Sequence, residues 1–349
     1  MNLLVIRMSA MGDVAMTVPV IKEVLKSNPD INITYVSREG FKIFFNGIKR
    51  LKFVSPDLDG DHKGLSGMYK LFQELRQDTT FDAVADLHSV MRSQVLSGLF
   101  RMRGISVASI HKGRTDKGNL VKQSAKKSKQ LKLTTERYAD VFRKLGITVN
   151  LSHKLPNKKR AKVPPLVQRE AGAKAGPWIG IAPFAQYKGK KYRFDKVGTL
   201  IELLQKTYPK SKIFLFGGGE VEVKKLRGLW DKYPQTVLAA GKMTLSEELN
   251  LMSNLDTMIS MDSANMHMAS LVGTKVVSVW GATHPYAGFM GYGQSIEWAA
   301  QIDMDCRPCS IFGNKECHKD GSYACMANLP ESLIVDKVKL LVPVAKGKK

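Results

Sequence analysis

Residues 3–27, LLVIRMSAMGDVAMTVPVIKEVLKS, decide the fold that the sequence predicts. Residues 3–7, with four consecutive apolar residues before Arg7, are predicted to form a buried parallel strand, and residues 14–27 show the apolar spacing of a helix. Small residues around Gly12 join the two and allow a tight turn. A strand, a tight turn and a helix in this order are typical of a parallel α/β sheet, so we expect this fold class.

The alternation of strand and helix continues along the chain and restarts once. Further strands are expected at residues 31–37, 51–56, 81–88, 105–109, 178–184, 212–219, 236–241, 257–263 and 275–281, with helical patterns between them. Residues 158–177 interrupt the pattern, because they are rich in Lys, Pro, Ala and Gly and are typical of a linker. We therefore expect two Rossmann-like domains facing across a cleft, at residues 1–157 and 178–329, with a helix and a basic tail at 330–349.

Length and composition agree with two domains and no membrane span. The 349 residues can fill two cores, and 44% hydrophobic with 24% charged residues is ordinary for a soluble globular protein. A transmembrane helix needs about 18 or more consecutive apolar residues, and no such run occurs. Arg7 and Asp13 interrupt the apolar N-terminus, which argues against a signal peptide, so a cytoplasmic location is expected.

The chain is strongly basic, with 54 Lys and Arg against 31 Asp and Glu and a formal net charge of +23. Residues 1–177 hold 32 basic and 15 acidic residues, a net +17, whereas residues 178–349 hold 22 and 16, a net +6. A basic half indicates an anionic partner, which can be nucleic acid, a membrane surface or a phosphorylated substrate. A generally basic, well-solvated surface explains the charge equally well.

Four turns that follow predicted strands carry candidate chemistry. Asp13 can serve as a general base for a hydroxyl group, or it can simply cap the next helix. A lysine within residues 188–191 can neutralise a departing phosphate, or the lysines can form a solvated cluster. Glu220 can bind ribose hydroxyls or stabilise a helix N-terminus, and residues 262–264 open a helix whose N–H groups can hold a diphosphate. His267, about one turn along that helix, is more simply interpreted as a core residue.

Seven short motifs follow one another along the chain, namely RMSAMGD at 7–13, DLHSVMRS at 86–93, ERY at 136–138, KKY at 190–192, FGG at 216–218, DSANMHMA at 262–269 and GATHP at 281–285. In this order they resemble the motifs of the family-nine glycosyltransferases, the ADP-heptose:lipopolysaccharide heptosyltransferases. The resemblance covers essentially the whole chain. It implies a GT-B type fold, with an acceptor-binding N-terminal domain and a C-terminal domain that binds the nucleotide sugar.

The resemblance also implies an inverting, metal-independent mechanism without a cofactor, in which an ADP-sugar is the donor substrate. The acceptor hydroxyl, deprotonated by Asp13, attacks the anomeric carbon while Lys190 or its neighbour Lys191 stabilises the departing diphosphate. The positions matching the family's nucleotide-sugar site are Ala182, Lys191, Gly218, Glu220, Asp262, Ser263, Ala264 and His267, and those expected to bind the acceptor are Ser9, Gly12, His88 and Arg92.

The uneven charge fits an acidic, phosphorylated, lipid-linked saccharide acceptor and peripheral contact with the cytoplasmic face of the inner membrane. His88, Arg92 and the basic residues 111–132 are the candidates for acceptor contacts. Nucleic acid is not an expected partner, because aromatic residues are sparse in the basic segments and neither a helix-turn-helix nor an RNP pattern occurs.

Three departures from the family pattern bear on the donor sugar. Ala264-Asn265 stand where the family has Gly-Pro, Tyr192 stands where it usually has Trp, and residues 182–185 only approximate the strand end that contacts the diphosphate. A transferase of the same family that uses another nucleotide sugar is therefore one alternative. A sugar-nucleotide epimerase of the same architecture is a second, and it would turn over donor without an acceptor.

All four cysteines lie in one short segment, as Cys306, Cys309, Cys317 and Cys325. This spacing can supply four tetrahedral ligands for a structural zinc ion, although it is not that of a standard zinc ribbon. Reduced thiols are the leading alternative, because a cytoplasmic protein keeps its cysteines reduced.

Overall fold

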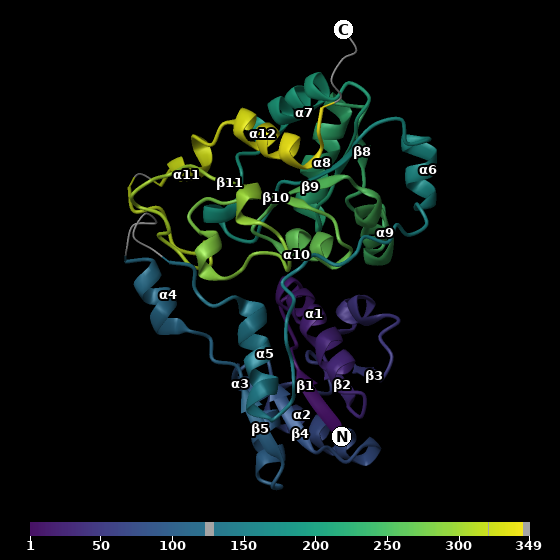
Figure 1. The fold of residues 1–349 in the computed structure, drawn as a ribbon, viewed down its shortest axis with the longest axis vertical. Helices are drawn as coiled ribbons and strands as arrows, with labels where there is room; N and C mark the ends of the chain where they lie inside the picture. The colour runs from purple at the N-terminus through teal and green to yellow at the C-terminus, as the bar shows by residue number, and fades with distance from the viewer. Residues whose placement is uncertain (123–128, 320, 345–349) are drawn as a thin grey trace. The chain divides into compact units, whose positions relative to one another are not determined.

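The computed structural model describes residues 1–122, 129–319 and 321–344, which form two compact units (Figure 1). The first unit comprises Met1–Lys112 and Lys132–Ser152, and the second comprises Gly113–Leu131 and His153–Lys349 as far as these ranges are described. Each unit contains one parallel sheet with helices packed on it, so the prediction of two parallel α/β domains is confirmed.

The sheet of the first unit has the strand order β3-β2-β1-β4-β5, and all its neighbours run parallel. Its strands are β1 (Asn2–Ile6), β2 (Asn32–Val36), β3 (Leu51–Val54), β4 (Ala83–Asp86) and β5 (Ser106–Ser109). Its helices are α1 (Met11–Ser27), α2 (Gly64–Asp78), α3 (Met91–Arg101) and α5 (Thr134–Lys144), with a 3-10 helix η1 (Glu39–Phe45). Helix α1 packs beside α5, and α2 packs beside α3.

The sheet of the second unit has the order β11-β10-β9-β6-β7-β8 and is also parallel. Its strands are β6 (Trp178–Ala182), β7 (Lys212–Leu215), β8 (Val237–Leu238), β9 (Thr257–Met261), β10 (Val276–Val279) and β11 (Ala299–Ala300). Its α-helices are α4 (Arg114–Leu120), α6 (Pro165–Ala171), α7 (Asp195–Thr207), α8 (Glu220–Lys232), α9 (Leu245–Asn254), α10 (Ala264–Leu271), α11 (Ala324–Ala327) and α12 (Glu331–Leu341). Its described residues also form three 3-10 turns, η3 (Lys188–Lys190), η4 (Pro285–Ala287) and η5 (Ile296–Trp298).

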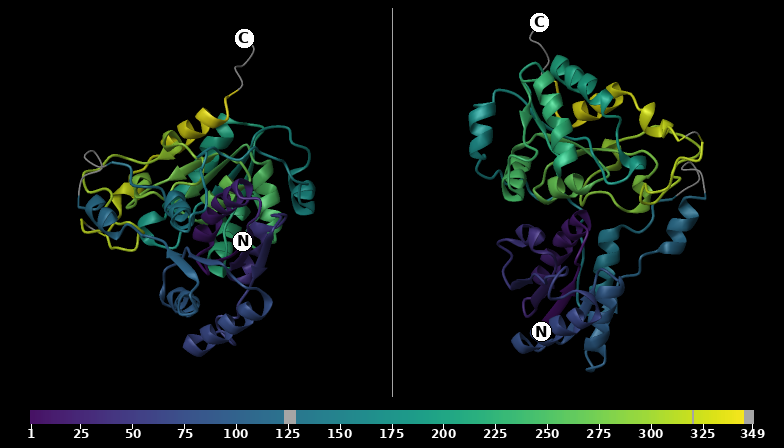
Figure 2. Two further views of the ribbon diagram at one scale, coloured as in Figure 1. Left: turned by 60° about the horizontal axis from the view of Figure 1, so that its bottom comes forward. Right: turned by 180° about the vertical axis from the view of Figure 1, so that it is seen from behind.

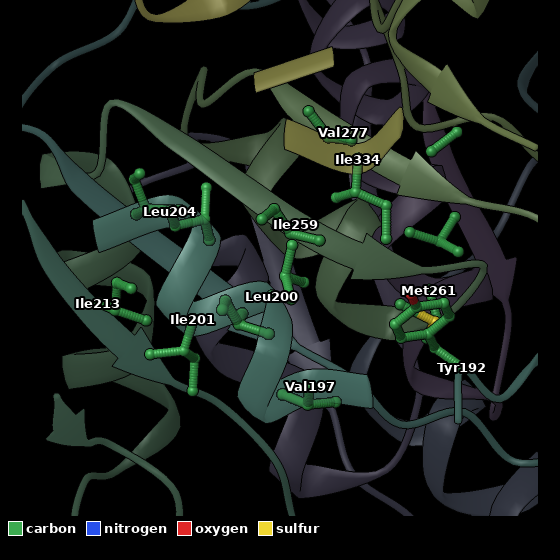
Figure 3. Packing of buried hydrophobic residues seen from close by; sticks show 14 of the residues in the cluster. Tyr192, Val197, Leu200, Ile201, Leu204, Ile213, Ile259, Met261, Val277 and Ile334 are labelled. Carbon is green, nitrogen blue, oxygen red and sulfur yellow. The ribbon is translucent and has the colours of Figure 1, made fainter. Parts of the chain in front are cut away.

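The central strands of both sheets are buried on their two faces, as is typical of parallel sheets. In β1 the residues from Leu3 to Ile6 are fully buried, which explains why this strand is an unbroken apolar run. Figure 3 shows the corresponding packing in the second unit, where Leu200 of α7 and Ile334 of α12 cover Ile259 of β9. Each such apolar side chain stabilises the fold by about 1.5–3 kcal/mol through its removal from water.

The C-terminal helix closes the core of the second unit. Helix α12, yellow in Figures 1 and 2, packs beside α7 and against β9, β10 and β11. Its apolar side chains, among them Val335 and Val338, are buried. The amphipathic pattern expected at 330–344 therefore forms a helix, while the basic tail at 345–349 lies outside the described residues.

The chain crosses from one unit to the other after Lys112, Leu131 and Ser152, whereas the sequence placed the domain boundary at 157–158. Residues from His153 onward pack with the second unit, where the Ala161 N–H donates to Ser253 Oγ at 2.9 Å. The polar interval after Lys112 also belongs to the second unit, because the Leu131 N–H donates to the Tyr286 carbonyl at 2.9 Å. The contacts of this interval were not readable from its composition.

Several local elements differ from the sequence expectations. Helix α1 begins at Met11, three residues before the expected start, and residues 39–45 form a 3-10 helix. The expected linker contains the short helix α6, which begins at Pro165 with Pro164 as its N-cap. The basic interval, for which the sequence left a long loop and a short helix as alternatives, contains the short helix α4, and its central residues 123–128 lie outside the described residues.

Within the three described ranges, none of the helices combines the length and the apolar character needed to cross a membrane.

Replacing Phe72 by Ala tests the core of the first unit. Phe72 is 2% exposed on α2 and meets Phe100 edge to face, with ring centroids 4.8 Å apart. We expect the substitution to lower the free energy of unfolding of this unit by about 3–5 kcal/mol, because a cavity replaces the ring. Denaturant unfolding followed by far-UV circular dichroism measures the loss.

Leu65→Ala on the same helix is the matched control, since Leu65 is 67% exposed and should change stability by no more than about 0.5 kcal/mol. Equal losses from the two substitutions would contradict the packing described for α2.

Candidate functional site

Two candidate sites lie at the carboxyl ends of two adjacent strands. The connections that follow these strands lead toward opposite edge strands of the sheet. In the first unit β1 stands between β2 and β4, and in the second unit β6 stands between β7 and β9. Ligands of open parallel sheets bind at such switch points, because the diverging loops leave space there. Residues 7–13 follow β1, Asp86 ends β4 and is followed by residues 87–88, and residues 262–264 follow β9. The motifs that begin at residues 7, 86 and 262 therefore lie at these two places.

The first site is built around an ion pair between Arg7 and Asp13. Arg7 Nη2 lies 2.5 Å from Asp13 Oδ2, and Arg7 Nη1 donates to the carbonyl of Leu87 at 2.7 Å. The guanidinium also lies over the ring of Tyr138, 5.6 Å from its centroid. Burial alone would lower the pKa of Arg7, but the electrostatic influence of Tyr138 and Asp13 leaves it raised, so Arg7 stays charged. The Asp13 side chain is 31% exposed and remains accessible.

Asp86 organises the turn that brings His88 to this site. Its Oδ1 accepts the backbone N–H groups of His88 and Ser89 at 2.9 and 2.8 Å, and its Oδ2 accepts the Ser93 hydroxyl at 3.1 Å. Burial raises the pKa of Asp86, while these hydrogen bonds oppose the rise. The carboxylate thus fixes the backbone between β4 and α3, as polar side chains commonly do in tight turns.

His88 is nine-tenths buried at this turn, and its Nε2 lies 3.5 Å from Ser9 Oγ. Burial, together with the positive charges of Arg7 and Lys112, lowers the pKa of His88 to about 4. Its Nδ1 is buried and has no hydrogen-bond partner within the described ranges. At neutral pH the imidazole is therefore uncharged.

The remaining acceptor candidates lie on the same edge of the sheet. Gly12 is in the first turn of α1, and Arg92 is in the first turn of α3, both half-buried. Lys112, which follows β5, donates from Nζ to the Ser89 carbonyl at 2.9 Å. The structure thus gathers Ser9 and His88 directly, and places Gly12 and Arg92 at the adjoining helix starts.

The second site also contains an ion pair, between Lys190 and Asp262. Lys190 Nζ lies 2.9 Å from Asp262 Oδ2, and the Thr283 hydroxyl donates to the same oxygen at 3.1 Å. The Asp262 side chain is 4% exposed and that of Lys190 is 15% exposed. A buried carboxylate is tolerated only when it is paired and hydrogen-bonded, and both conditions are met here.

The cysteine-bearing segment, residues 306–325, packs against Lys190 and its neighbour Gly189. The Gly189 N–H donates to the Gly313 carbonyl at 3.3 Å, and a Cβ at Gly313 would lie 2.6 Å from Cγ of Lys190. Gly313 also has a positive φ of 76°, so two independent reasons favour glycine there. Arg307 is fully buried and donates to the carbonyl groups of Gly281, Trp280, Thr283 and Ile302. Its guanidinium therefore fixes the turn that carries Thr283.

The other nucleotide-sugar candidates lie at or after the carboxyl ends of β6, β7 and β9. Ala182 ends β6 and is buried, Ser263 is the N-cap of α10, Ala264 begins that helix, and His267 is buried one turn further along it. Lys191, Gly218 and Glu220 are exposed. At the glycine turn the Gly218 N–H donates to Glu222 Oε2 at 3.0 Å, and not to Glu220.

The four cysteines influence one another electrostatically. Burial raises the pKa of Cys325 to about 11, and burial together with the neighbouring Cys306 raises the pKa of Cys309. Among the described residues, no three His, Cys, Asp or Glu side chains are placed to hold a metal ion. The zinc interpretation stays a prediction, and total-metal analysis of the purified protein tests it.

Sequence reasoning assigned no role to three residues that shape the two sites. Arg7 and Thr283 belong to motifs that the sequence singled out, so the motif letters were a signal without an assigned role. Lys112 was included among the acceptor candidates only as one of the basic residues of segment 111–132. Arg307 gave no signal, because its partners are four backbone carbonyl groups and the Gln301 side chain, which only the fold brings together.

The family model described as glycosyltransferase family 9 (heptosyltransferase) matches residues 68–318. Lipopolysaccharide heptosyltransferase 1 of Campylobacter coli is 25% identical over 305 residues, which cover 82% of this chain and 85% of that protein. The solved structure of a family 9 glycosyl transferase from Veillonella parvula has a TM-score of 0.75 at 17% identity, covering 97% of this chain and 96% of the other. The structure of ADP-heptose lps heptosyltransferase II of E. coli has a TM-score of 0.69 at 15% identity and covers 98% of both chains. These two structures share the fold of this chain.

The buried histidines predict how stability depends on pH. Burial and nearby arginines lower the pKa of both His88 and His284 to about 4. The folded state therefore protonates these side chains only at a lower pH than the unfolded chain does. Their contribution to stability is present above about pH 6.5 and is lost as the pH falls toward 4, by about 2 kcal/mol for each. Urea unfolding measured between pH 7 and pH 4 tests this.

His88→Asn should flatten that decline, because it removes one of the two groups. His318→Asn is the matched control, since His318 is exposed. An identical decline in wild type and His88→Asn would contradict the burial of a neutral imidazole at this site.

Proposed function

The chain belongs to glycosyltransferase family 9 (heptosyltransferase), and we propose that it transfers a heptose from ADP-heptose to the inner core of lipopolysaccharide. The acceptor is Kdo-lipid A or heptosyl-Kdo-lipid A. The names of the relatives support this choice, since one is a lipopolysaccharide heptosyltransferase 1 and another an ADP-heptose lps heptosyltransferase II. The observation that carries the proposal is an accessible carboxylate, Asp13, held by a buried cation at the switch point of the first unit.

In the proposed reaction Asp13 is the general base. Its carboxylate takes the proton of an acceptor hydroxyl while that oxygen forms a bond to the anomeric carbon of the donor. The bond between the anomeric carbon and the diphosphate breaks at the same time, and its electron pair leaves with ADP. Attack opposite the leaving group inverts the anomeric centre, and the step uses neither a metal ion nor a cofactor.

The second unit is proposed to bind the nucleotide sugar. Lys190 carries the positive charge that stabilises the departing diphosphate, together with the backbone N–H groups at Ser263 and Ala264, where α10 begins. Lys191, Ala182, Gly218, Glu220 and His267 complete the proposed donor contacts. Asp262 is paired with Lys190, so its proposed contact with the donor has to coexist with that ion pair.

The first unit is proposed to bind the acceptor through Ser9, Gly12, His88 and Arg92. The net charge of +17 on residues 1–177 favours a phosphorylated lipid-linked saccharide and an anionic membrane surface. We therefore place the enzyme in the cytoplasm, in peripheral contact with the inner membrane. The second candidate function is a transferase of this family that uses another nucleotide sugar as its donor. Ala264-Asn265 at the start of α10 favours it, because the family has Gly-Pro there.

ADP release measured with and without acceptor tests the proposal. Purified protein is incubated with ADP-heptose and Kdo-lipid A, in parallel with Asp13→Asn. Acceptor-dependent release that falls about 100-fold or more in the variant supports the donor, the acceptor and the base together. Acceptor-dependent release with a different nucleotide sugar, and none with ADP-heptose, would replace the donor assignment and keep the transferase.

Lys190→Met tests the leaving-group role. We expect kcat to fall about 100- to 1000-fold, because the substitution removes one preorganised positive charge from the departing diphosphate. The matched control is Lys210→Met. Lys210 is exposed and lies just before β7, at the amino-terminal ends of the strands, so its replacement should keep kcat within about twofold.

Lys190→Arg retains a charge beside Asp262 and separates loss of folding from loss of chemistry. A large loss of kcat in Lys191→Met, combined with nearly wild-type kcat in Lys190→Met, would transfer the role to Lys191.

A further inference from the structure

The proposed function uses Asp13 as the base and assigns no role to Arg7, the buried cation that pairs with it. The residue is 7% exposed at the end of β1, and burying a guanidinium is unfavourable unless its donors are paired. Its Nε nonetheless has no hydrogen-bond partner among the described residues. An arginine placed only for stability would satisfy this donor, so the arrangement points to a different requirement.

The two terminal nitrogens of Arg7 are fixed by groups from different elements. Nη1 donates to the Leu87 carbonyl just after β4, and Nη2 pairs with Asp13 in the first turn of α1. The Tyr138 ring of α5 packs against the guanidinium. A planar fork held at three places has one orientation, and it transmits that orientation to the carboxylate that it binds.

The consequence for Asp13 is an asymmetry between its two oxygens. Oδ2 is occupied by Arg7 at 2.5 Å, whereas no hydrogen bond within the described ranges occupies Oδ1. A carboxylate anchored through one oxygen presents the other in a fixed direction. Such fixed geometry is what a general base needs, because proton transfer requires hydrogen-bond distance to the reacting hydroxyl.

We propose that Arg7 is the positioning residue of the catalytic base, anchoring Asp13 through Oδ2 so that Oδ1 receives the proton of the acceptor hydroxyl. This inference rests on the proposed function, in which Asp13 is that base. Arg7 does not touch the substrate. It acts through Asp13, by holding the carboxylate in one orientation and by placing a positive charge beside it.

The same geometry gives a role to the ERY segment at residues 136–138, which the proposed reaction does not use. Tyr138 is fully buried, and its hydroxyl has no hydrogen-bond partner within the described ranges. Its ring is therefore the part in use, as the surface on which the Arg7 guanidinium rests. Helix α5 packs beside α1, which carries Asp13, so one helix pair holds both members of the ion pair.

The charged and titratable groups around the pair come from four elements. Tyr35 of β2, Tyr138 of α5 and His88 after β4 interact electrostatically with Arg7 or Asp13, and Lys112 lies near His88. Of these, His88 is neutral above about pH 5, because its pKa is lowered to about 4. Arg7 is therefore the cation in direct contact with Asp13, and its removal should disfavour the ionised carboxylate.

The test compares Arg7→Lys and Arg7→Gln with Arg143→Gln, each made in the wild type and in Asp13→Asn. Arg143 is the matched control, because it is an arginine of the same unit that pairs with Glu136 and Asp140 away from Asp13. The readouts are kcat, KM for donor and acceptor, the pH dependence of kcat, and the melting temperature. Asp13→Asn activity is followed with radiolabelled donor.

We expect Arg7→Gln to lower kcat about 100-fold and to move the acid limb of the pH profile upward, with the donor KM unchanged. Arg7→Lys should retain about one tenth of the wild-type kcat, since it keeps the charge and loses the fork. In the Asp13→Asn background both substitutions should change kcat less than about twofold, because the two residues act as one unit.

An equal loss of kcat in both backgrounds would overturn the inference and leave Arg7 a purely structural residue. Wild-type kcat and an unchanged acid limb in a folded Arg7→Gln protein would overturn it as well, and Arg7→Lys serves if Arg7→Gln does not fold. Wild-type activity of Asp13→Asn would instead overturn the proposed base, an outcome that is distinct from the other two.

Discussion

Both candidate sites depend on the strand order of the parallel sheets. In each sheet the first strand is central, so the connections after it and after one neighbouring strand lead toward opposite edge strands. In the first unit the strands are β1 and β4, and in the second they are β6 and β9. The loops after these strands cannot cover the gap between them, so polar side chains at the strand ends face each other across it. The order of the strands therefore brings residues 7 and 87 together although 80 positions separate them.

The two ion pairs at these places have opposite arrangements. In the first unit the cation is the buried member, with Arg7 9% and Asp13 31% exposed at their side chains. In the second unit the carboxylate is the buried member, with Asp262 4% and Lys190 15% exposed. In each case the more exposed partner is the group with a proposed chemical role, a base in one unit and a cation for the diphosphate in the other. The buried partner holds the exposed one in place, because a desolvated counter-ion interacts more strongly than a solvated one.

The fold was largely predictable because apolar runs such as residues 3–6 and 178–182 are long enough to identify buried strands. The strand-end residues were predictable for the same reason, since a turn must follow each strand. The assignment of residues 113–131 to the second unit was not, because it depends on contacts such as the Lys117 ammonium 4.4 Å from the Phe289 ring centroid. Pairing within the sites was also hidden, since a sequence shows that Lys190 and Asp262 are present but not that each neutralises the other.

The cysteine-bearing segment has a structural role that needs no metal ion. Arg307 lies between Cys306 and Cys309 and donates to backbone carbonyl groups on both sides of Ala282, whose N–H in turn donates to the Gly189 carbonyl at 2.8 Å. Gly313 of the same segment packs against the stem of Lys190. A buried guanidinium bonded only to neutral acceptors needs all of them in place, because each unpaired donor would be left desolvated. The segment therefore determines where the Lys190 ammonium lies, through hydrogen bonds and close packing that a side chain at Gly313 would displace.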